Sequence, residues 1–402
     1  MPLAGSLLRH EGDGGQVTHI ELFFDLVYVF AITQLSHHLL AHLTVSGTLQ
    51  TVLLLAMVWM VWVYTTWVTN WLDPQRIPVR LMLVALMLVA LVMSAALPEA
   101  FTDRGLWVGG AYALLQIGRS VFAVAGLAGE RLQRNFQRIL CWCILSGALA
   151  VAGGFAHDET RIGLWIAAVT VDLLGGVVGF YTPGLGRSTT VDWTISGSHF
   201  AERCQAFVLI ALGESVVVTG STLSDLREVS FAEGGTFVAA FAGVVALWWI
   251  YFDRSADASA DIIARSSDPG RLGARAYHLI HPIMVAGIIV TAAADERVLA
   301  HPTATTETST AWLVLGGTGL FLAGHAAFKA TVWRTVPWTR LGAIVVLALL
   351  GIVATSLSAL LLSLLTAVVV VVLAAADRLL SSGREAPHNA ASPRRLQAGN
   401  SQ

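Results

Sequence analysis

The chain has 402 residues, of which 55% are hydrophobic and only 12% charged, and its mean hydropathy is +0.70. About a quarter of the residues in soluble domains are charged, so this composition excludes a soluble enzyme and a nucleic-acid-binding protein. It indicates a polytopic membrane protein. The formal net charge of −2 is uninformative, because in membranes the placement of charge matters more than its sum.

Twelve apolar segments, each bounded by charges or by Pro and Gly, follow one another along the chain. A spanning helix needs roughly 20 apolar residues. The first six segments cover about 20–40, 49–71, 78–97, 106–128, 136–156 and 161–181, and the last six cover about 201–220, 234–252, 276–293, 311–329, 339–355 and 359–376. The last two are almost continuous, but the polar Thr355, Ser356 and Ser358 favour a hairpin over a single long helix. The sequence therefore predicts an all-α fold with about twelve transmembrane helices.

The ends of the chain are polar. The first twenty residues lack the apolar core of a signal peptide, so we expect the first span to direct its own insertion. Residues 379–402 carry too little apolar area to offset chain entropy and are predicted to be a disordered cytoplasmic tail.

Cysteine and tryptophan lie mostly within or near the spans. Cys141, Cys143 and Cys204 have no CxxC spacing and are expected to be buried hydrophobes. The tryptophans lie mostly near span ends, which is typical of interfacial anchors.

The basic residues predict the orientation. Lys and Arg in short loops favour the cytoplasmic side of a membrane. With the N-terminus inside, eighteen basic residues lie on the cytoplasmic side and four outside, while Arg119 and Arg203 lie within spans. We therefore expect a multi-pass protein of the cytoplasmic membrane with both termini in the cytoplasm.

The two halves of the sequence resemble each other. THIELFFDLVYVFAITQLS from Thr18 aligns with SHFAERCQAFVLIALGES from Ser198, and DPQRIPVR from Asp73 aligns with DPGRLGAR from Asp268. The order and the loop positions agree, which predicts two parallel six-helix repeats. The expected division is a cytoplasmic N-terminal segment (1–18), a first repeat (19–183), a cytoplasmic linker (184–198), a second repeat (199–378) and the tail (379–402).

Ionisable residues inside a membrane are costly and normally face the bundle interior or a wet cavity. The primary candidates for a transport pathway or for proton coupling lie on the first and seventh spans and are Glu21, Asp25, Glu202, Arg203 and Glu214. Glu21 and Glu202 could equally be structural caps at helix N-termini. Asp25 lies more than one turn inside its span, so it must pair with an arginine such as Arg203 or Arg119, or be protonated.

Further candidates lie on other spans. They are Arg119, Asp172, His281 and His325. Arg119 and His325 occupy matching positions in the two repeats, and a structural ion pair is as plausible there as a substrate contact. The three histidines at the end of the first span, at positions 37, 38 and 42, are more typical of solvated residues than of a metal site. We therefore expect neither a metal site nor a cofactor.

The segments IELFFDLVYVFAITQLSHHL and HFAERCQAFVLIALGES, together with WWIYFD at Trp248, resemble the signatures of the bacterial low temperature requirement A (LtrA) family of membrane proteins. The resemblance covers roughly residues 18 to 380. The family name describes a cold-growth phenotype and implies no mechanism.

FFDLVYVFAI at Phe23 is also similar to the F-S-D signature that opens each repeat in a family of two-repeat potassium channels. That resemblance implies a central pathway lined by the first and seventh helices. The chain departs from this signature, because Phe24 stands in place of the serine and Glu21 in place of an arginine.

Three classes of function remain after these exclusions. Paired repeats with acidic groups on equivalent helices favour a transporter or channel for an unidentified ion or small solute. A membrane-embedded sensor or stress-adaptation protein is the alternative. A membrane-embedded enzyme is less favoured, because no nucleophile–base pair, HExxH or P-loop is present. The expected partners are the lipid bilayer and the solute, without nucleic acid, and a homo-oligomer is not excluded.

Overall fold

The structure is a computed structural model that describes residues 7–9, 17–188, 197–226, 228–253 and 255–385. Over these residues the chain forms helices and isolated β-bridges, without a strand of a sheet. Twelve helical segments in the described ranges are long and apolar enough to cross a membrane. This confirms the prediction of an all-α, polytopic fold with about twelve transmembrane helices.

The helices fall into two halves in chain order. The first half contains α1 (His19–Ala41), α2 (Val45–Trp71), α3 (Ile77–Ala96), η1 (Leu97–Glu99), α4 (Gly105–Gly126), α5 (Gln133–Phe155) and α6 (Asp158–Val177). The second half contains α7 (Gly197–Ser224), α8 (Phe231–Phe252), α9 (Ser255–Ala264), α10 (Pro269–Gly273), η3 (Ala274–Ile280), α11 (His281–Ala300), α12 (Thr308–Trp333), α13 (Trp338–Val353), η4 (Ala354–Ser356) and α14 (Ala359–Glu385). The short α9 has no counterpart among the predicted spans.

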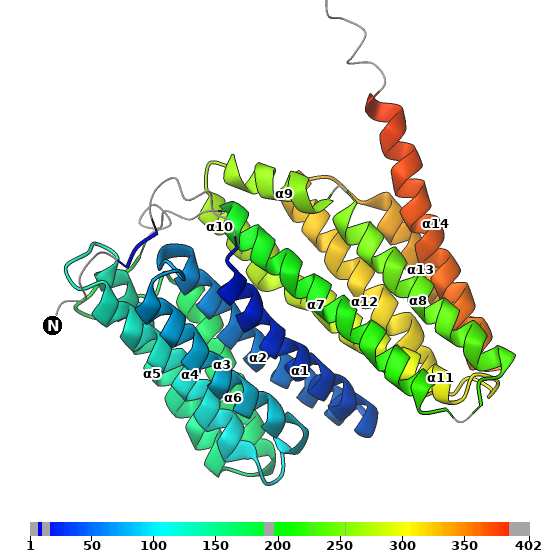
Figure 1. The fold of residues 1–402 in the computed structure, drawn as a ribbon, viewed down its shortest axis with the longest axis horizontal. Helices are drawn as coiled ribbons and strands as arrows, with labels where there is room; N and C mark the ends of the chain where they lie inside the picture. Colours follow the sequence, from blue (N-terminus) through cyan, green and yellow to red (C-terminus); the bar gives the residue numbers. More distant parts are fainter. Residues whose placement is uncertain (1–6, 10–16, 189–196, 227, 254, 386–402) are drawn as a thin grey trace, which may run out of the picture.

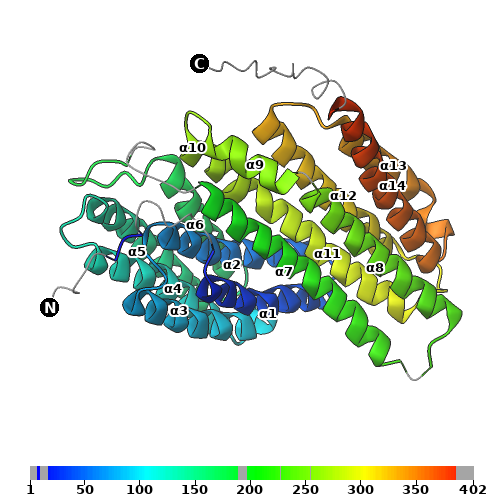
Figure 2. The same ribbon diagram turned by 45° about the horizontal axis from the view of Figure 1, so that its top comes forward.

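The two halves lie side by side, and α1 packs against α7 where they meet (Figures 1 and 2). In both views the blue to teal helices of the first half occupy one side and the green to orange helices of the second half the other. Helix α1 also contacts α11, and α2 contacts both α7 and α11. The first two helices therefore form most of the junction with the second half.

Two loops at equivalent places in the halves share a local structure. Asp73 Oδ1 accepts a hydrogen bond from the backbone N–H of Gln75 at 2.9 Å, and Asp268 Oδ1 accepts one from Arg271 at 3.0 Å. Each aspartate also lies 3.6 Å from an arginine three residues later. This likeness agrees with an internal duplication, which stays a prediction, as do the proposed repeat boundaries.

Glycine allows the closest helix contacts in each half. A Cβ at Gly109 of α4 would lie 2.1 Å from the carbonyl oxygen of Ala150 on α5, and a Cβ at Gly287 of α11 would lie 2.4 Å from the backbone nitrogen of Phe321 on α12. Small residues at such crossings let helix backbones approach closely in membranes. The structure thus explains two of the many glycines by packing.

The expected hairpin near the end of the chain is present, but two helices run further than predicted. A break at η4 and the extended Leu357 separates α13 from α14. Helix α11 continues to Ala300 rather than ending near residue 293, and α14 continues to Glu385, seven residues into the predicted tail. Both extensions contain Leu and Arg, which favour helix. The rest of the tail, 386–402, and residues 189–196 of the predicted linker lie outside the described residues.

Two expectations about side chains are wrong in part. Cys141 is exposed on α5, whereas Cys143 and Cys204 are buried. Trp59, Trp62 and Trp165 are fully buried and so are not interfacial anchors. Position along a span does not reveal which way a side chain faces, and the packed interior takes up these indole rings.

Candidate functional site

Two carboxylates of α1 and a guanidinium of α7 form the centre of a buried charge network. Arg203 donates from Nε and Nη2 to the two oxygens of Asp25 at 2.9 and 2.5 Å, and from Nη1 to Glu21 Oε1 at 3.0 Å. Glu21 and Asp25 are four residues apart and therefore share one face of α1. All three side chains are completely buried. Of the two partners expected for Asp25, the structure provides Arg203.

The N-terminal segment and the start of α7 bring further charged groups to Glu21. Arg9 Nη2 donates to Glu21 Oε2 at 3.0 Å, and His199 Nε2 lies 2.8 Å from Glu21 Oε1. The backbone N–H and hydroxyl of Thr18 donate to the same carboxylate at 2.9 and 2.8 Å, which makes Glu21 part of a capping box for α1. Glu21 is thus both a helix cap and a member of the network.

Helix α2 supplies neutral hydrogen-bonding groups to the same site. Trp62 Nε1 donates to Asp25 Oδ1 at 2.7 Å, and Arg203 Nη1 donates to Thr69 Oγ1 at 3.2 Å. Asn70 Nδ2 lies 3.3 Å from His199 Nδ1. Each charged group at the centre therefore has several partners, and α1, α2 and α7 together supply most of them, as buried charges require.

Among the residues that the structure describes, the network balances two carboxylates against two guanidinium groups, and His199 is a further titratable member. Removing charges from water costs several kcal/mol for each ion, and apolar side chains of similar volume often stabilise a fold better than a buried ion pair does. A group of five ionisable side chains at the junction of the two halves is therefore poorly explained by stability alone.

The other two primary candidates do not join this network. Glu202 is half-buried and accepts a hydrogen bond from the backbone N–H of Val17 at 3.2 Å. Glu214 is buried eleven residues further along α7 than Arg203, about 16 Å along the helix axis. Thr33 of α1 donates to Glu214 Oε1 at 2.5 Å, so Glu214 makes a second, separate polar contact between α1 and α7.

A layer of aromatic rings lies between these two polar contacts. The ring of Phe207 on α7 lies 4.5 Å from that of Trp62, 5.3 Å from Trp59 and 6.1 Å from Tyr28. All four side chains are buried. The α1–α7 junction is therefore closed by packed rings between the network and Glu214.

Arg119 and Asp172 form a second polar cluster inside the first half. Arg119 Nη2 donates to Gln116 Oε1 at 2.5 Å, and Gln116 Nε2 donates to Asp172 Oδ2 at 2.5 Å. Tyr112 also donates its hydroxyl to Asp172. A glutamine thus links the arginine to the carboxylate, and Arg119 does not bond Asp172 directly. Arg119 Nε and Asp172 Oδ1 are buried without a hydrogen-bond partner.

His281 and His325 lie in the interior of the second half. His281 Nε2 lies 2.7 Å from the Tyr251 hydroxyl, and Arg340 Nε donates to His325 Nδ1 at 3.4 Å. Arg340 also donates from Nη1 to Asp377 at 2.6 Å. Arg119 and His325, at matching positions in the sequence, therefore have different partners, and neither joins the network at the α1–α7 junction.

A cavity of about 380 Å³ lies between the halves, at the end of the bundle where α2 ends and α10 begins. Tyr64, Trp67 and Trp71 of α2 line one side, and Arg271 of α10 and His278 of η3 line the other. The volume falls within the range of small-molecule sites, roughly 300–1,000 Å³. The segment η3 is a π-helix, and such segments occur frequently at functional sites.

Arg119 also reaches this cavity. Its Nη1 donates to Thr65 Oγ1 of α2 at 3.3 Å. Helix α2 thus contacts the cavity through Trp67 and the charge network through Trp62 and Thr69. The cavity and the charge network therefore share one helix.

The histidines at the end of α1 show no metal-site geometry. His38 and His42 stack at 4.6 Å, and His38 Nδ1 lies 3.0 Å from Thr51 Oγ1. Over the described ranges, the structure contains no group of three or more His, Cys, Asp or Glu side chains placed to hold a metal ion.

Several members of the network could not be chosen from the sequence. Arg9 was counted only as a cytoplasmic charge, because no pattern connects it to a residue twelve positions later. His199 aligned with His19, but His19 is exposed. Trp62 had the clearest signal, since it opens a WVY triplet that matches WIY at Trp249.

The fold and this site define the chain as an all-helical, polytopic membrane protein with a buried charge network where its two halves meet. Residues 16–375 match the family model described as bacterial low temperature requirement A protein (LtrA). The chain belongs to the LtrA family. It is 36% identical over 339 residues to an uncharacterized protein of Rhizobium meliloti (strain 1021), a match that covers 83% of this chain and 82% of that protein. No solved structure shows significant similarity to the chain.

Proposed function

We propose that this protein is an ion-coupled transporter of a small solute in the cytoplasmic membrane, and that the α1–α7 junction opens and closes during its cycle. The observation that carries the proposal is the network in which Glu21, Asp25 and Arg203 pair across the halves. Intramembrane ionisable groups typically mark substrate or ion pathways.

Protonation supplies a way to open the junction. A proton on Asp25 removes the charge that holds Arg203 in its bidentate pair, and Arg203 then keeps its contacts with Glu21 and Thr69. The aromatic layer around Phe207 closes the same junction further along α7. Loss of the ion pair would allow these rings to separate and the α1–α7 junction to open. Protonation of Asp25 then favours the open junction, and the open junction in turn favours protonation.

The cavity between the halves is the proposed solute site. Its rings offer apolar contacts, while Arg119, Arg275 and His278 offer donors. No Asp or Glu lines it among the described residues. This lining suits a small solute with an apolar body and an anionic group.

The proposal is tested by flux into proteoliposomes that contain a fluorescent pH reporter, with imposed proton, sodium and potassium gradients. Wild-type protein should carry a gradient-dependent flux above that of empty vesicles, and Asp25→Asn should lose the pH-dependent part while remaining folded. Glu99→Gln is the matched control, because Glu99 pairs with Arg104 on the exposed surface. If the flux into vesicles with wild-type protein equalled that into empty vesicles for every gradient and for small organic anions, the result would favour the sensor alternative.

A further inference from the structure

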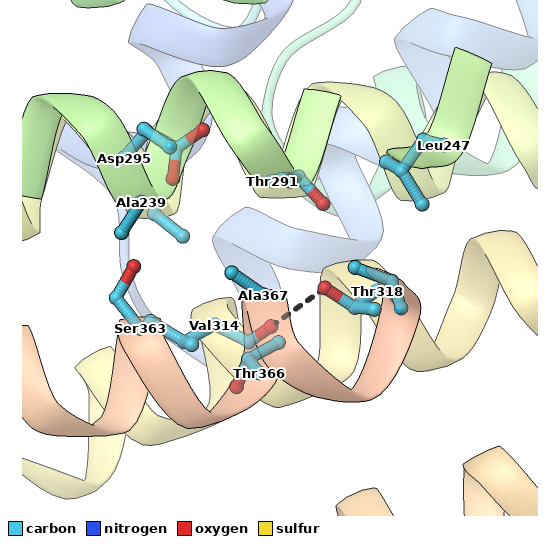
Figure 3. A pocket seen from close by; sticks show the side chains of 13 residues that line it. Ala239, Leu247, Thr291, Asp295, Val314, Thr318, Ser363, Thr366 and Ala367 are labelled. Carbon is cyan, nitrogen blue, oxygen red and sulfur yellow. Dashed lines mark hydrogen bonds between the residues drawn. The ribbon is translucent and has the colours of Figure 1, made fainter. Parts of the chain in front are cut away.

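A small cavity of about 30 Å³ lies inside the second half, between α8, α11, α12 and α14 and apart from the charge network (Figure 3). This volume suits one water-sized particle. Thr318, one of its lining residues, lies ten residues from the start of α12, about 15 Å along the helix axis. The cavity is therefore deep within the span.

Asp295 of α11 presents an unpaired carboxylate to this cavity. Its Oδ2 is buried without a hydrogen-bond partner, and the residue is only 7% exposed. The nearest basic residue in sequence, Arg297, instead donates to Glu307 and Thr310. A lone carboxylate inside a membrane costs several kcal/mol unless its charge is compensated. A cation bound in the cavity would supply that compensation, and protonation of the carboxylate is the alternative.

Three of the four hydroxyl groups that line the cavity, those of Thr291, Thr318 and Thr366, donate their hydrogens elsewhere, whereas Ser363 is the fourth. Thr291 donates its hydroxyl hydrogen to the carbonyl of Gly287 at 2.9 Å, and Thr366 donates to Leu362 at 2.9 Å. Thr318 donates to the carbonyl of Val314 at 3.2 Å, the bond drawn in Figure 3. Because each hydrogen is committed to a carbonyl four residues earlier, these oxygens can act only as acceptors toward the cavity.

The acceptors surround the cavity from different helices. Figure 3 shows Asp295 and Thr291 of α11 on one side and Thr318, Thr366 and Ser363 on the other. Carboxylate and hydroxyl oxygens are hard ligands, which suit hard cations. A single carboxylate is neutralised by a single positive charge, whereas a divalent ion would leave an excess charge in the membrane.

We propose that this cavity is a binding site for one monovalent metal cation, with Asp295 as the charged ligand and Thr291, Thr318 and Thr366 as neutral ligands. The ion's role as a driving ion rests on the proposed transport, whereas its binding does not. Asp295 is not among the candidates from the sequence, because the charged run Asp-Glu-Arg that begins with it predicts the end of the ninth span near residue 293.

The test measures thermal unfolding of the full chain in nanodiscs, where choline chloride is replaced by NaCl or KCl at constant ionic strength. At least one of the two metal ions should raise Tm saturably, by roughly 2–6 °C. Asp295→Asn should abolish the rise. Glu99→Gln, which changes an exposed carboxylate of the first half, should keep it.

Thr318→Val and Thr366→Val each keep the Asp295 carboxylate and remove one hydroxyl ligand. Each should raise the cation concentration that gives half of the Tm increase several-fold. These two variants test the site even if Asp295→Asn fails to fold. Equal Tm in choline, sodium and potassium would overturn the proposal, as would a full cation response in both threonine variants. Because no flux is measured, failure of this site and failure of the transport proposal remain distinguishable.

Discussion

Arg203 is the residue on which the α1–α7 network depends most. Arg203→Ala should leave Glu21 and Asp25 buried without their shared partner, and removing one member of a buried pair typically costs about 3–5 kcal/mol. Arg203→Lys should recover only part of this, because an ammonium group cannot make the bidentate bond to Asp25. Thermal unfolding in detergent measures the loss.

The matched control for these variants is Arg104→Ala, since Arg104 pairs with Glu99 where both side chains are about half exposed. Exposed pairs contribute about 0–1 kcal/mol. If Arg203→Ala and Arg104→Ala unfolded at the same temperature, the buried network would contribute nothing to stability.

Substitution of Trp62 tests the neutral hydrogen-bonding groups of the network. Trp62→Phe keeps an aromatic ring but removes the N–H that Trp62 donates to Asp25 at 2.7 Å. Losing a hydrogen bond to a buried charged group should cost about 1–3 kcal/mol in unfolding free energy. Trp107→Phe is the control, because Trp107 is 62% exposed and should tolerate the change.

At the scale of the elements, close helix crossings should be sensitive to single methyl groups. Gly287→Ala places a Cβ 2.4 Å from the Phe321 backbone and should destabilise the α11–α12 contact by about 1–3 kcal/mol. Gly316→Ala on α12 has open space around it and should be neutral. Equal unfolding temperatures for the two variants would contradict the close packing of these helices.

The number of membrane-spanning helices could be predicted from the sequence, whereas their exact ends and contacts could not. Apolar runs and flanking charges predict spans well, because the bilayer imposes length and composition. The charged Asp295 predicts an end of the ninth span near residue 293, but it lies inside α11, which continues to Ala300. Asp25 and Arg203 were found because charges are rare in spans, but Arg9 and Thr69 required the three-dimensional packing.

For the whole molecule, the placement of basic residues predicts both termini in the cytoplasm. A green fluorescent protein fused to the C-terminus should therefore fluoresce, and an alkaline phosphatase fused there should be inactive. The same two reporters inserted in the loop at Thr102 should behave in the opposite way. Active phosphatase at the C-terminus would show that this terminus lies outside the cytoplasm. The orientation would then be the reverse of the predicted one, or the number of spans would be odd.

The central claim, that the α1–α7 junction opens during transport, is tested most directly by locking it. Thr33 and Glu214 lie in contact across the junction, and both are changed to cysteine in a chain whose three natural cysteines are replaced. A short bis-methanethiosulfonate cross-linker, which joins the two cysteines through disulfides, should reduce proteoliposome flux to background. A reducing agent should cleave these disulfides and restore the flux, while each single-cysteine variant should have the same flux before and after the treatment. Undiminished flux with complete cross-linking would contradict the claim.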